Sequence, residues 1–268
     1  MKDLFERILE NKGPLGKWAS VAEGYFVFPK LEGPISNRMK FNGKEVITWS
    51  VNDYLGLANQ PEVREVDAAA AAKYGSAYPM GARMMSGHTD LHEQLERELA
   101  EFVNKEAAYV LNFGYQGILS TIDTLVSKND VIVYDVDAHA CIIDGVRLHQ
   151  GKRFTYKHND IESLEKNLER ATKMAEQTGG GILVISEGVF GMRGEQGRLK
   201  EIVALKEKFQ FRYWSTTPTV LEPLESAEQE QERSKACKTI SMFTLPPLLN
   251  LWPLQGPLLL PTKKLLTS

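Results

Sequence analysis

Three stretches of the sequence carry residues whose types and spacing could do chemistry, and each follows an apolar run typical of a buried strand. The first is Asn112-Phe113-Gly114-Tyr115, which precedes a helix-like segment. A glycine there lets the backbone approach an anion, and the N–H groups at the start of the next helix suit a phosphate. The same pattern is typical of ordinary strand-to-helix turns, so alone it leaves both interpretations open.

The other two stretches add an imidazole and a carboxylate. His139 opens a helix-like segment after the apolar run 131–134, where it could stack on a planar ring, act as an acid or base, or simply cap the helix. Glu187 follows the run 182–186 and begins a glycine-containing loop that is also compatible with a long turn. Ligands bind beyond the carboxyl ends of parallel strands, so we expect the chemistry of the protein in these loops.

The elements that must position these loops alternate between helix-like and strand-like segments from residue 61 to residue 209. Continuous apolar runs such as VIVY and ILVI predict an α/β fold with a mostly parallel sheet covered by helices on both faces. Residues 1–50 predict an N-terminal arm with a short helix at 4–9 and a strand at 46–49. We expect helices at 61–73, 90–104, 116–126, 141–149, 161–177 and from 199 to near 209, and strands at 107–111, 131–134, 153–156 and 182–186.

Composition argues against several classes of function. The net charge of −3 and the pI near 6.0 disfavour nucleic acid and anionic membrane as partners, because phosphate binding needs clustered positive charge. The acidic start MKDLFERILE is unlike a signal peptide, and two cysteines make no disulfide framework, so we expect a cytoplasmic protein without a membrane span. His92 and Glu96 share a helix face without a third ligand nearby, and we therefore expect no metal site. Cys141, at a helix start, could have a lowered pKa, but a structural role is the preferred interpretation.

A longer series of motifs, spread over residues 45–213, resembles the α-oxoamine synthases, which include serine palmitoyltransferase, 2-amino-3-ketobutyrate CoA ligase and 8-amino-7-oxononanoate synthase. These are pyridoxal-phosphate enzymes, and the resemblance implies a large domain of the PLP-dependent transferase fold type I, incomplete in this chain. The matching residues are Asn52-Asp53-Tyr54-Leu55-Gly56-Leu57, Gly81-Ala82-Arg83, Gly114-Tyr115, His139-Ala140-Cys141-Ile142-Ile143-Asp144-Gly145 and Glu187-Gly188-Val189-Phe190-Gly191-Met192.

The resemblance implies a role for each matching site residue. Gly114 and Tyr115 bind the cofactor phosphate through backbone N–H groups, and His139 stacks on the pyridine ring. Glu187 belongs to the surroundings of the cofactor, and Asn52 lies near the substrate carboxylate or the cofactor hydroxyl. The family pattern E-G-x-F-S-M has a serine where this chain has Gly191, and an acidic neighbour where it has Arg193. These departures leave the amino acid and the acyl-CoA open.

Two residues that the family needs are missing. Pyridoxal phosphate works as an electron sink, with an aspartate on its pyridinium nitrogen and a lysine in a Schiff base. The family supplies them in D-[DE]-A-H and T-x-x-K motifs, but no acidic residue follows Tyr213 before Glu222, and Lys235, Lys238, Lys263 and Lys264 lie in no such context. The sequence therefore predicts no catalytic residue in the chain as it stands.

The stretch Trp214 to Thr219 suggests why the motifs are missing. It can be written as the codons TGG, TCx, ACx, ACx, CCx and ACx, and a shift back by one base permits Val-Asp-Asp-Ala-His. The same shift over residues 246–253 permits Thr-Phe-Ala-Lys-Ser-Met-Ala, with the lysine codon straddling Leu249 and Asn250. We therefore expect residues 214–268 to be an out-of-frame, mostly disordered tail after a partial cofactor-binding domain at 51–213.

The resemblance to the family and the inferred change of reading frame together define the expected function. The family condenses an amino acid with an acyl-CoA and is homodimeric, whereas this chain is expected to be inactive, without covalent attachment of pyridoxal phosphate and with its dimer in doubt. The alternative is a non-catalytic fragment, or a partner subunit that lacks the lysine.

Overall fold

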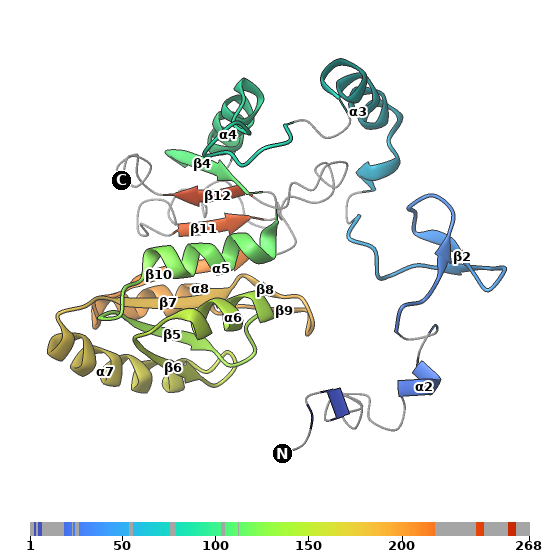
Figure 1. Ribbon diagram of the computed structural model, residues 1–268. Helices are drawn as coiled ribbons and strands as arrows, with labels where there is room; N and C mark the ends of the chain where they lie inside the picture. The colour runs from blue at the N-terminus through green and yellow to red at the C-terminus, as the bar shows by residue number, and fades with distance from the viewer. Residues whose placement is uncertain are drawn as a thin grey trace. The chain divides into compact units, whose positions relative to one another are not determined.

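A computed structural model of the chain describes residues 3, 5–6, 19–22, 24, 27–53, 56–75, 79–102, 105–111, 113–217, 240–243 and 257–260. The chain divides into two compact units, residues 1–66 and residues 67–268 (Figure 1). The predicted arm of residues 1–50 falls within the first unit. The helix predicted at 4–9 lies largely outside the described residues.

The first unit contains a small antiparallel sheet. Its strands are β1 (Leu31–Glu32), β2 (Arg38–Phe41) and β3 (Lys44–Ile47), in the order β1-β2-β3. Asn42 and Gly43 join β2 to β3 with φ of 49° and 74°, the left-handed conformations that a two-residue hairpin turn requires. The unit also has a short helix α2 (Ala19–Ala22) and a 3-10 turn η2 (Leu57–Asn59).

The second unit carries the large sheet and its helices. Its helices are α4 (Asp90–Phe102), α5 (Gly114–Leu125), α6 (Ala140–Leu148), α7 (Ile161–Thr178), α8 (Leu199–Ala204) and the 3-10 turn η3 (Leu205–Glu207), and α3 (Pro61–Tyr74) begins in the first unit. Its strands are β4 (Ala107–Val110), β5 (Val131–Asp135), β6 (Lys152–Tyr156), β7 (Ile182–Glu187), β10 (Arg212–Thr217), β11 (Ile240–Phe243) and β12 (Pro257–Leu260), with the hairpin β8 (Val189–Phe190) and β9 (Glu195–Gln196) after β7.

The large sheet has the order β4-β12-β11-β10-β7-β5-β6. The pairs β6–β5, β5–β7, β7–β10 and β10–β11 are parallel, while β12 runs antiparallel to both of its neighbours. The predicted α/β fold with a mostly parallel sheet is therefore confirmed.

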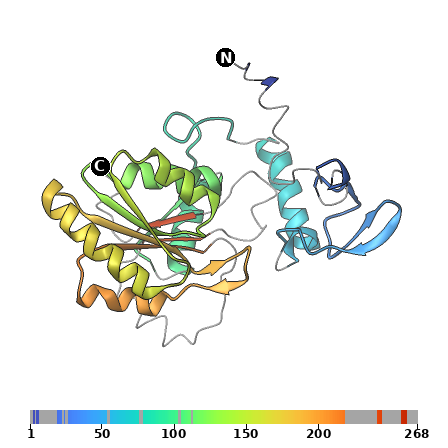
Figure 2. The same cartoon turned by 90° about the horizontal axis from the view of Figure 1, so that it is seen from below.

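Alternate residues of the central strands build two cores, one on each face of the sheet. On one face Ile132, Ile185 and Trp214 pack with residues of α5 and α6, and on the other Val133, Val184 and Tyr213 pack with residues of α7 and α8. Figure 2 shows the strands between these helical layers. This two-sided burial explains why VIVY and ILVI are continuous apolar runs.

Strand β10 crosses the boundary that the sequence placed at residue 213. It pairs with β7 from Arg212 to Thr216, and Thr216 lies opposite Glu187. Trp214, Ser215 and Thr216 are buried. The backbone therefore continues the sheet to Thr217.

Candidate functional site

The candidate site lies at the carboxyl ends of the parallel strands. β5 ends at Asp135 and β7 ends at Glu187, and the loops that follow lead to helix α6 and to the β8–β9 hairpin. This is the edge at which open α/β sheets bind ligands.

Glu187 joins the end of β7 to the start of α6. Its side chain is 2% exposed and accepts a hydrogen bond from the backbone N–H of His139. The pKa of this carboxyl is raised to about 7, and burial is the largest cause. The nearby charge of Asp135 acts in the same direction, and the hydrogen bond from the His139 N–H acts against both. The structure places Glu187 beside His139, where it holds the backbone of the loop.

His139 presents an exposed imidazole at the start of α6. It is the N-cap residue of that helix, and its Nδ1 accepts a hydrogen bond of 3.2 Å from the backbone N–H of Cys141. The simple cap interpretation of His139 therefore describes part of its role. The residue is exposed, and its stacking on a planar ligand stays a prediction.

Tyr115 connects this loop to the start of α5. Its ring lies edge-on to that of His139, with the centroids 6.3 Å apart, and its hydroxyl donates a hydrogen bond to Asp144 of α6. That hydrogen bond to Asp144 raises the pKa of the Tyr115 hydroxyl. Gly114 is the first residue of α5, and the positive end of the helix dipole at this position suits an anion.

The structure thus brings Gly114, Tyr115, His139 and Glu187 together within the second unit. Asn52 belongs to the first unit, in the loop between β3 and η2, and its role near a substrate stays a prediction.

A histidine that the sequence analysis missed stands beside this site. The ring nitrogens of His158 lie 3.0 Å from Oδ1 of Asp135 and 2.8 Å from Oε2 of Glu195. Its partners are 23 and 37 residues away along the chain, so no local pattern indicates them. The weak available signal is a polar Lys-His-Asn-Asp stretch directly after β6.

Other residues considered from the sequence have structural partners. Glu96 accepts hydrogen bonds from Arg83 and from the backbone N–H of Val110, and Nδ1 of His92 lies 2.9 Å from the hydroxyl of Thr89. Among the residues described, no group of three or more His, Cys, Asp or Glu side chains could hold a metal ion.

Cys141 does not have the lowered pKa that its place at a helix start allowed. Its side chain is buried, and burial raises the pKa of the thiol to about 12, with the charge of Glu187 acting in the same direction.

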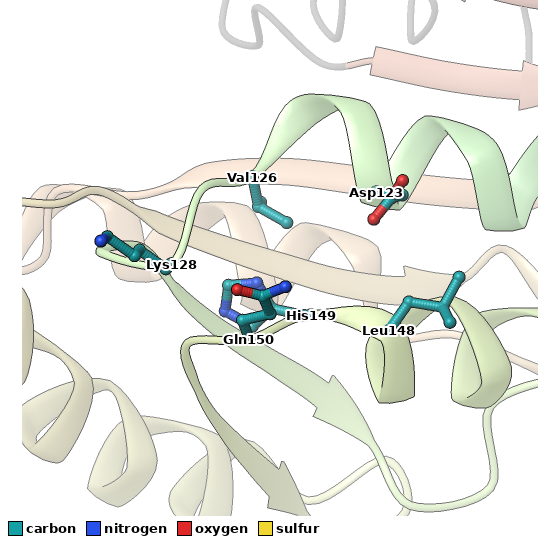
Figure 3. Close-up of a pocket in the computed structure, with 6 residues that line it drawn as sticks. All are labelled: Asp123, Val126, Lys128, Leu148, His149 and Gln150. Atoms are coloured by element: carbon teal, nitrogen blue, oxygen red, sulfur yellow. The ribbon is translucent and has the colours of Figure 1, made fainter.

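A small pocket lies at the opposite end of the sheet. Figure 3 shows its lining, which comes from the end of α5, the loop before β5, the end of α6 and the segment after α6. The residues are Asp123, Val126, Lys128, Leu148, His149 and Gln150. Because it adjoins the amino end of β5, this pocket is separate from the candidate site at the carboxyl ends.

Together, the sheet and the site define an α/β protein with a cluster of polar groups at the carboxyl ends of its parallel strands, the place where such sheets bind ligands. The chain belongs to the aminotransferase class I and II family, whose model matches residues 44–212. The resemblance inferred from the motifs is confirmed.

Relatives with curated names include acyltransferases. The chain is 76% identical over 212 residues to a cysteate-C-fatty acyltransferase of Capnocytophaga ochracea, covering 79% of this chain and 50% of that protein. It is 38% identical over 190 residues to a serine palmitoyltransferase of Bacteroides ovatus (70% of this chain, 47% of that protein). It is 41% identical over 187 residues to an 8-amino-7-oxononanoate synthase of Alkaliphilus metalliredigens (69% and 46%). The chain spans about half the length of these relatives.

Solved structures show the same fold. The Sphingomonas wittichii serine palmitoyltransferase matches with a TM-score of 0.80 and 25% identity, covering 99% of this chain and 66% of that one. A serine palmitoyltransferase variant from S. paucimobilis with a bound PLP–myriocin aldimine matches with a TM-score of 0.82 and 24% identity, covering 99% and 68%. Within the part of this chain that the structure describes, no helix is long and apolar enough to cross a membrane.

Proposed function

We propose that the chain is part of a pyridoxal-phosphate-dependent acyltransferase that condenses an amino acid with an acyl-CoA. The observation that carries the proposal is the 76% identity over 212 residues to a cysteate-C-fatty acyltransferase. That name supports cysteate as the amino acid and a fatty acyl group as the other substrate. The complete protein would act in the cytoplasm and, as the motif resemblance implies, as a homodimer.

The residues at the strand edge fit the cofactor in part. The start of α5 at Gly114 and Tyr115 would hold the phosphate, and the exposed imidazole of His139 would stack on the pyridine ring. Glu187 holds the backbone of His139 in place, and Asn52 would meet the substrate carboxylate. When bound, the cofactor supplies an electron sink for the carbanion of the amino acid.

The chain itself would be inactive, because the Schiff-base lysine and the pyridine-binding aspartate are missing from its sequence. We attribute the loss to a change of reading frame near Tyr213. The family model supports this placement, since its match ends at residue 212.

The buried polar side chains of β10 lie at the proposed frame change. Nε1 of Trp214, Oγ of Ser215 and Oγ1 of Thr216 are buried without a hydrogen-bond partner among the described residues. Each buried polar group of this kind costs about 1–3 kcal/mol. The alternate frame replaces them with Val-Asp-Asp, and the first aspartate codon straddles residues 215 and 216, next to the position opposite Glu187.

Sequencing the gene around codon 213 tests the frame. We expect GTC-GAC-GAC-GCC-CAC, or a synonym, one base out of the present frame. A DNA sequence that encodes no Val-Asp-Asp-Ala-His there would refute the frame change and leave the missing motifs unexplained.

Borohydride reduction tests the inactivity. The purified chain with added pyridoxal phosphate should give no lysine-linked adduct by mass spectrometry. The matched control is the product of a gene with the frame restored, which should give one adduct on the lysine straddling codons 249 and 250. A stable lysine adduct in the unrestored chain contradicts the proposed inactivity.

The alternative is a non-catalytic partner subunit, which the missing lysine and the retained phosphate site favour. It predicts a stable complex between this chain and a frame-restored chain when both are produced together. Size-exclusion chromatography with mass detection distinguishes that complex from an inert fragment.

A further inference from the structure

His158 is surrounded by carboxylates that come from three parts of the chain. Nδ1 lies 3.0 Å from Asp135 at the end of β5 and 3.9 Å from Asp137 in the following loop, and Nε2 lies 2.8 Å from Glu195 in β9. The imidazole is largely buried, and its ring meets Phe190 of β8 edge-on at 4.4 Å between centroids. A single side chain thus bridges the edge of the parallel sheet and the β8–β9 hairpin.

The geometry requires the charged form of the imidazole. A neutral imidazole has one N–H, so one of its two nitrogens is an acceptor, and an ionised carboxylate can only accept. Both nitrogens of His158 are within hydrogen-bond distance of carboxylate oxygens. In the neutral form one of these contacts would place a lone pair against a lone pair.

Asp135 is held in place by further donors. Its Oδ1 also accepts the backbone N–H of Asp137 at 2.8 Å, and its Oδ2 accepts that of Asn159 at 3.0 Å. Asn159 has a φ of 50°, an uncommon conformation for a residue other than glycine, and its side-chain amide donates to the carbonyl of Gln196 in the hairpin. The turn at 158–159 is thus constrained on both sides.

The hairpin leads directly back to the candidate site. Gly188 connects Glu187 to β8, and the Gly188 N–H donates to the carbonyl of Thr216 in β10. Gly197 at the other end donates to the carbonyl of Gly188, and a Cβ at Gly197 would clash with the carbonyl oxygen of Glu187. The base of the hairpin is therefore packed tightly against the residue that holds His139.

We propose that His158 is a positioning residue: as an imidazolium it bridges Asp135 and Glu195, fixes the β8–β9 hairpin to the carboxyl end of β5, and so keeps Glu187 on the backbone of His139. The inference rests on the proposed function for its link to the cofactor, but the bridge itself does not. Deprotonation breaks one of the two contacts and loosens the hairpin.

The charged groups around His158 set the pH range of this effect. Burial lowers its pKa, but hydrogen bonds to Asp135 and Glu195 and the charge of Asp137 raise it, with a net increase. Arg193 from the hairpin pairs with Asp137 at 2.5 Å and offsets that charge, and Glu187 is the remaining carboxyl nearby. A raised pKa means that the bridge contributes fully below about pH 6.5 and is lost as pH rises through the folded-state pKa.

Hydrogen exchange of the full chain tests the bridge without any cofactor. After correction for intrinsic rates, protection of the amides of residues 188–197 should fall by up to about tenfold per pH unit above pH 6.5, as release of one proton requires. His158→Gln should expose the hairpin at pH 6 and remove the pH dependence. The matched control, His88→Gln, removes a histidine 3.2 Å from Glu93 on another loop and should leave the hairpin unchanged.

An NMR titration keeps the test decisive if His158→Gln does not fold. The His158 ring should titrate above its ordinary pKa of about 6.5, and Glu195→Gln, at a half-exposed site, should lower that pKa. An ordinary or lower pKa of His158, or hairpin protection independent of pH in the wild-type chain, overturns the proposal.

Binding of pyridoxal phosphate, measured by fluorescence in the same samples, separates this inference from the proposed function. If the hairpin loosens and cofactor binding weakens above pH 6.5 in the wild-type chain, and His158→Gln shows no such pH dependence, both the positioning role and the proposed function are supported. If the hairpin loosens above pH 6.5 but the cofactor does not bind at any pH, the inference about the His158 bridge stands and the result counts against the proposed function. A loosened hairpin with pH-independent binding overturns the positioning role.

Discussion

Replacing Glu187 with glutamine should make the protein less sensitive to rising pH. The carboxyl is 2% exposed and has a pKa of about 7 in the folded chain, raised by burial. A glutamine side chain at this position has the same shape and keeps an oxygen that can accept the backbone N–H of His139, but it carries no charge at any pH. The substitution therefore isolates the cost of ionising this side chain in the folded state.

The magnitude follows from the difference between the folded pKa of about 7 and the ordinary value of 4.5. Between these values the unfolded chain has released the proton and the folded chain still holds it, so stability falls as pH rises. At 1.36 kcal/mol per pKa unit, a difference of about 2.5 units corresponds to about 3 kcal/mol. The wild-type chain should lose this amount from pH 4.5 to above pH 7, and Glu187→Gln should not.

Urea unfolding at pH 4.5 and pH 8 measures the effect as a difference between variants, because all other titrating groups are shared. Glu176→Gln, at an exposed position of α7, is the matched control and should follow the wild type. An equal loss of stability in the wild type and Glu187→Gln would refute the reasoning that burial holds the proton on this carboxyl.

Three further substitutions test the packing, each by the free energy of unfolding in urea. Asp160→Ala removes the side chain that caps α7 and should cost about 1 kcal/mol, and an unchanged stability would contradict the cap. Gly180→Ala would drive a Cβ into the carbonyl oxygen of Asn129 and should cost about 1–3 kcal/mol, whereas Gly181→Ala meets its nearest atom at 3.6 Å and should be tolerated better. Leu168→Ala empties a fully buried site and should cost about 2–5 kcal/mol.

Much of the sheet could be predicted because its strands are buried on both faces. The runs 131–134 and 182–186 each extend by one residue in the structure, to Asp135 and Glu187. Helix α5 begins at Gly114 rather than at the predicted residue 116, because the first turn of a helix needs no partner for its N–H groups and so carries little sequence signal. The Asn42-Gly43 hairpin was missed although this dipeptide is a strong turn signal.

The site residues that belong to a sequence motif could be predicted, whereas those brought together from distant segments could not. Gly114, Tyr115, His139 and Glu187 were recognised as a set and lie together. His158 was missed because its contacts depend on which strands become neighbours, and the sequence does not state the order of strands in the sheet. Nothing local distinguishes it from a surface histidine.

The order of strands has a consequence for synthesis on the ribosome. As the chain emerges, β6 adds beside β5, β7 adds on the other side of β5, and β10 adds beyond β7, so every new strand joins an open edge of the growing sheet. This vectorial assembly needs nothing encoded after codon 217, whereas β4 joins the sheet through β11 and β12, which are made last. A nascent chain can therefore join β5, β6, β7 and β10 in a compact intermediate before β11 and β12 are made.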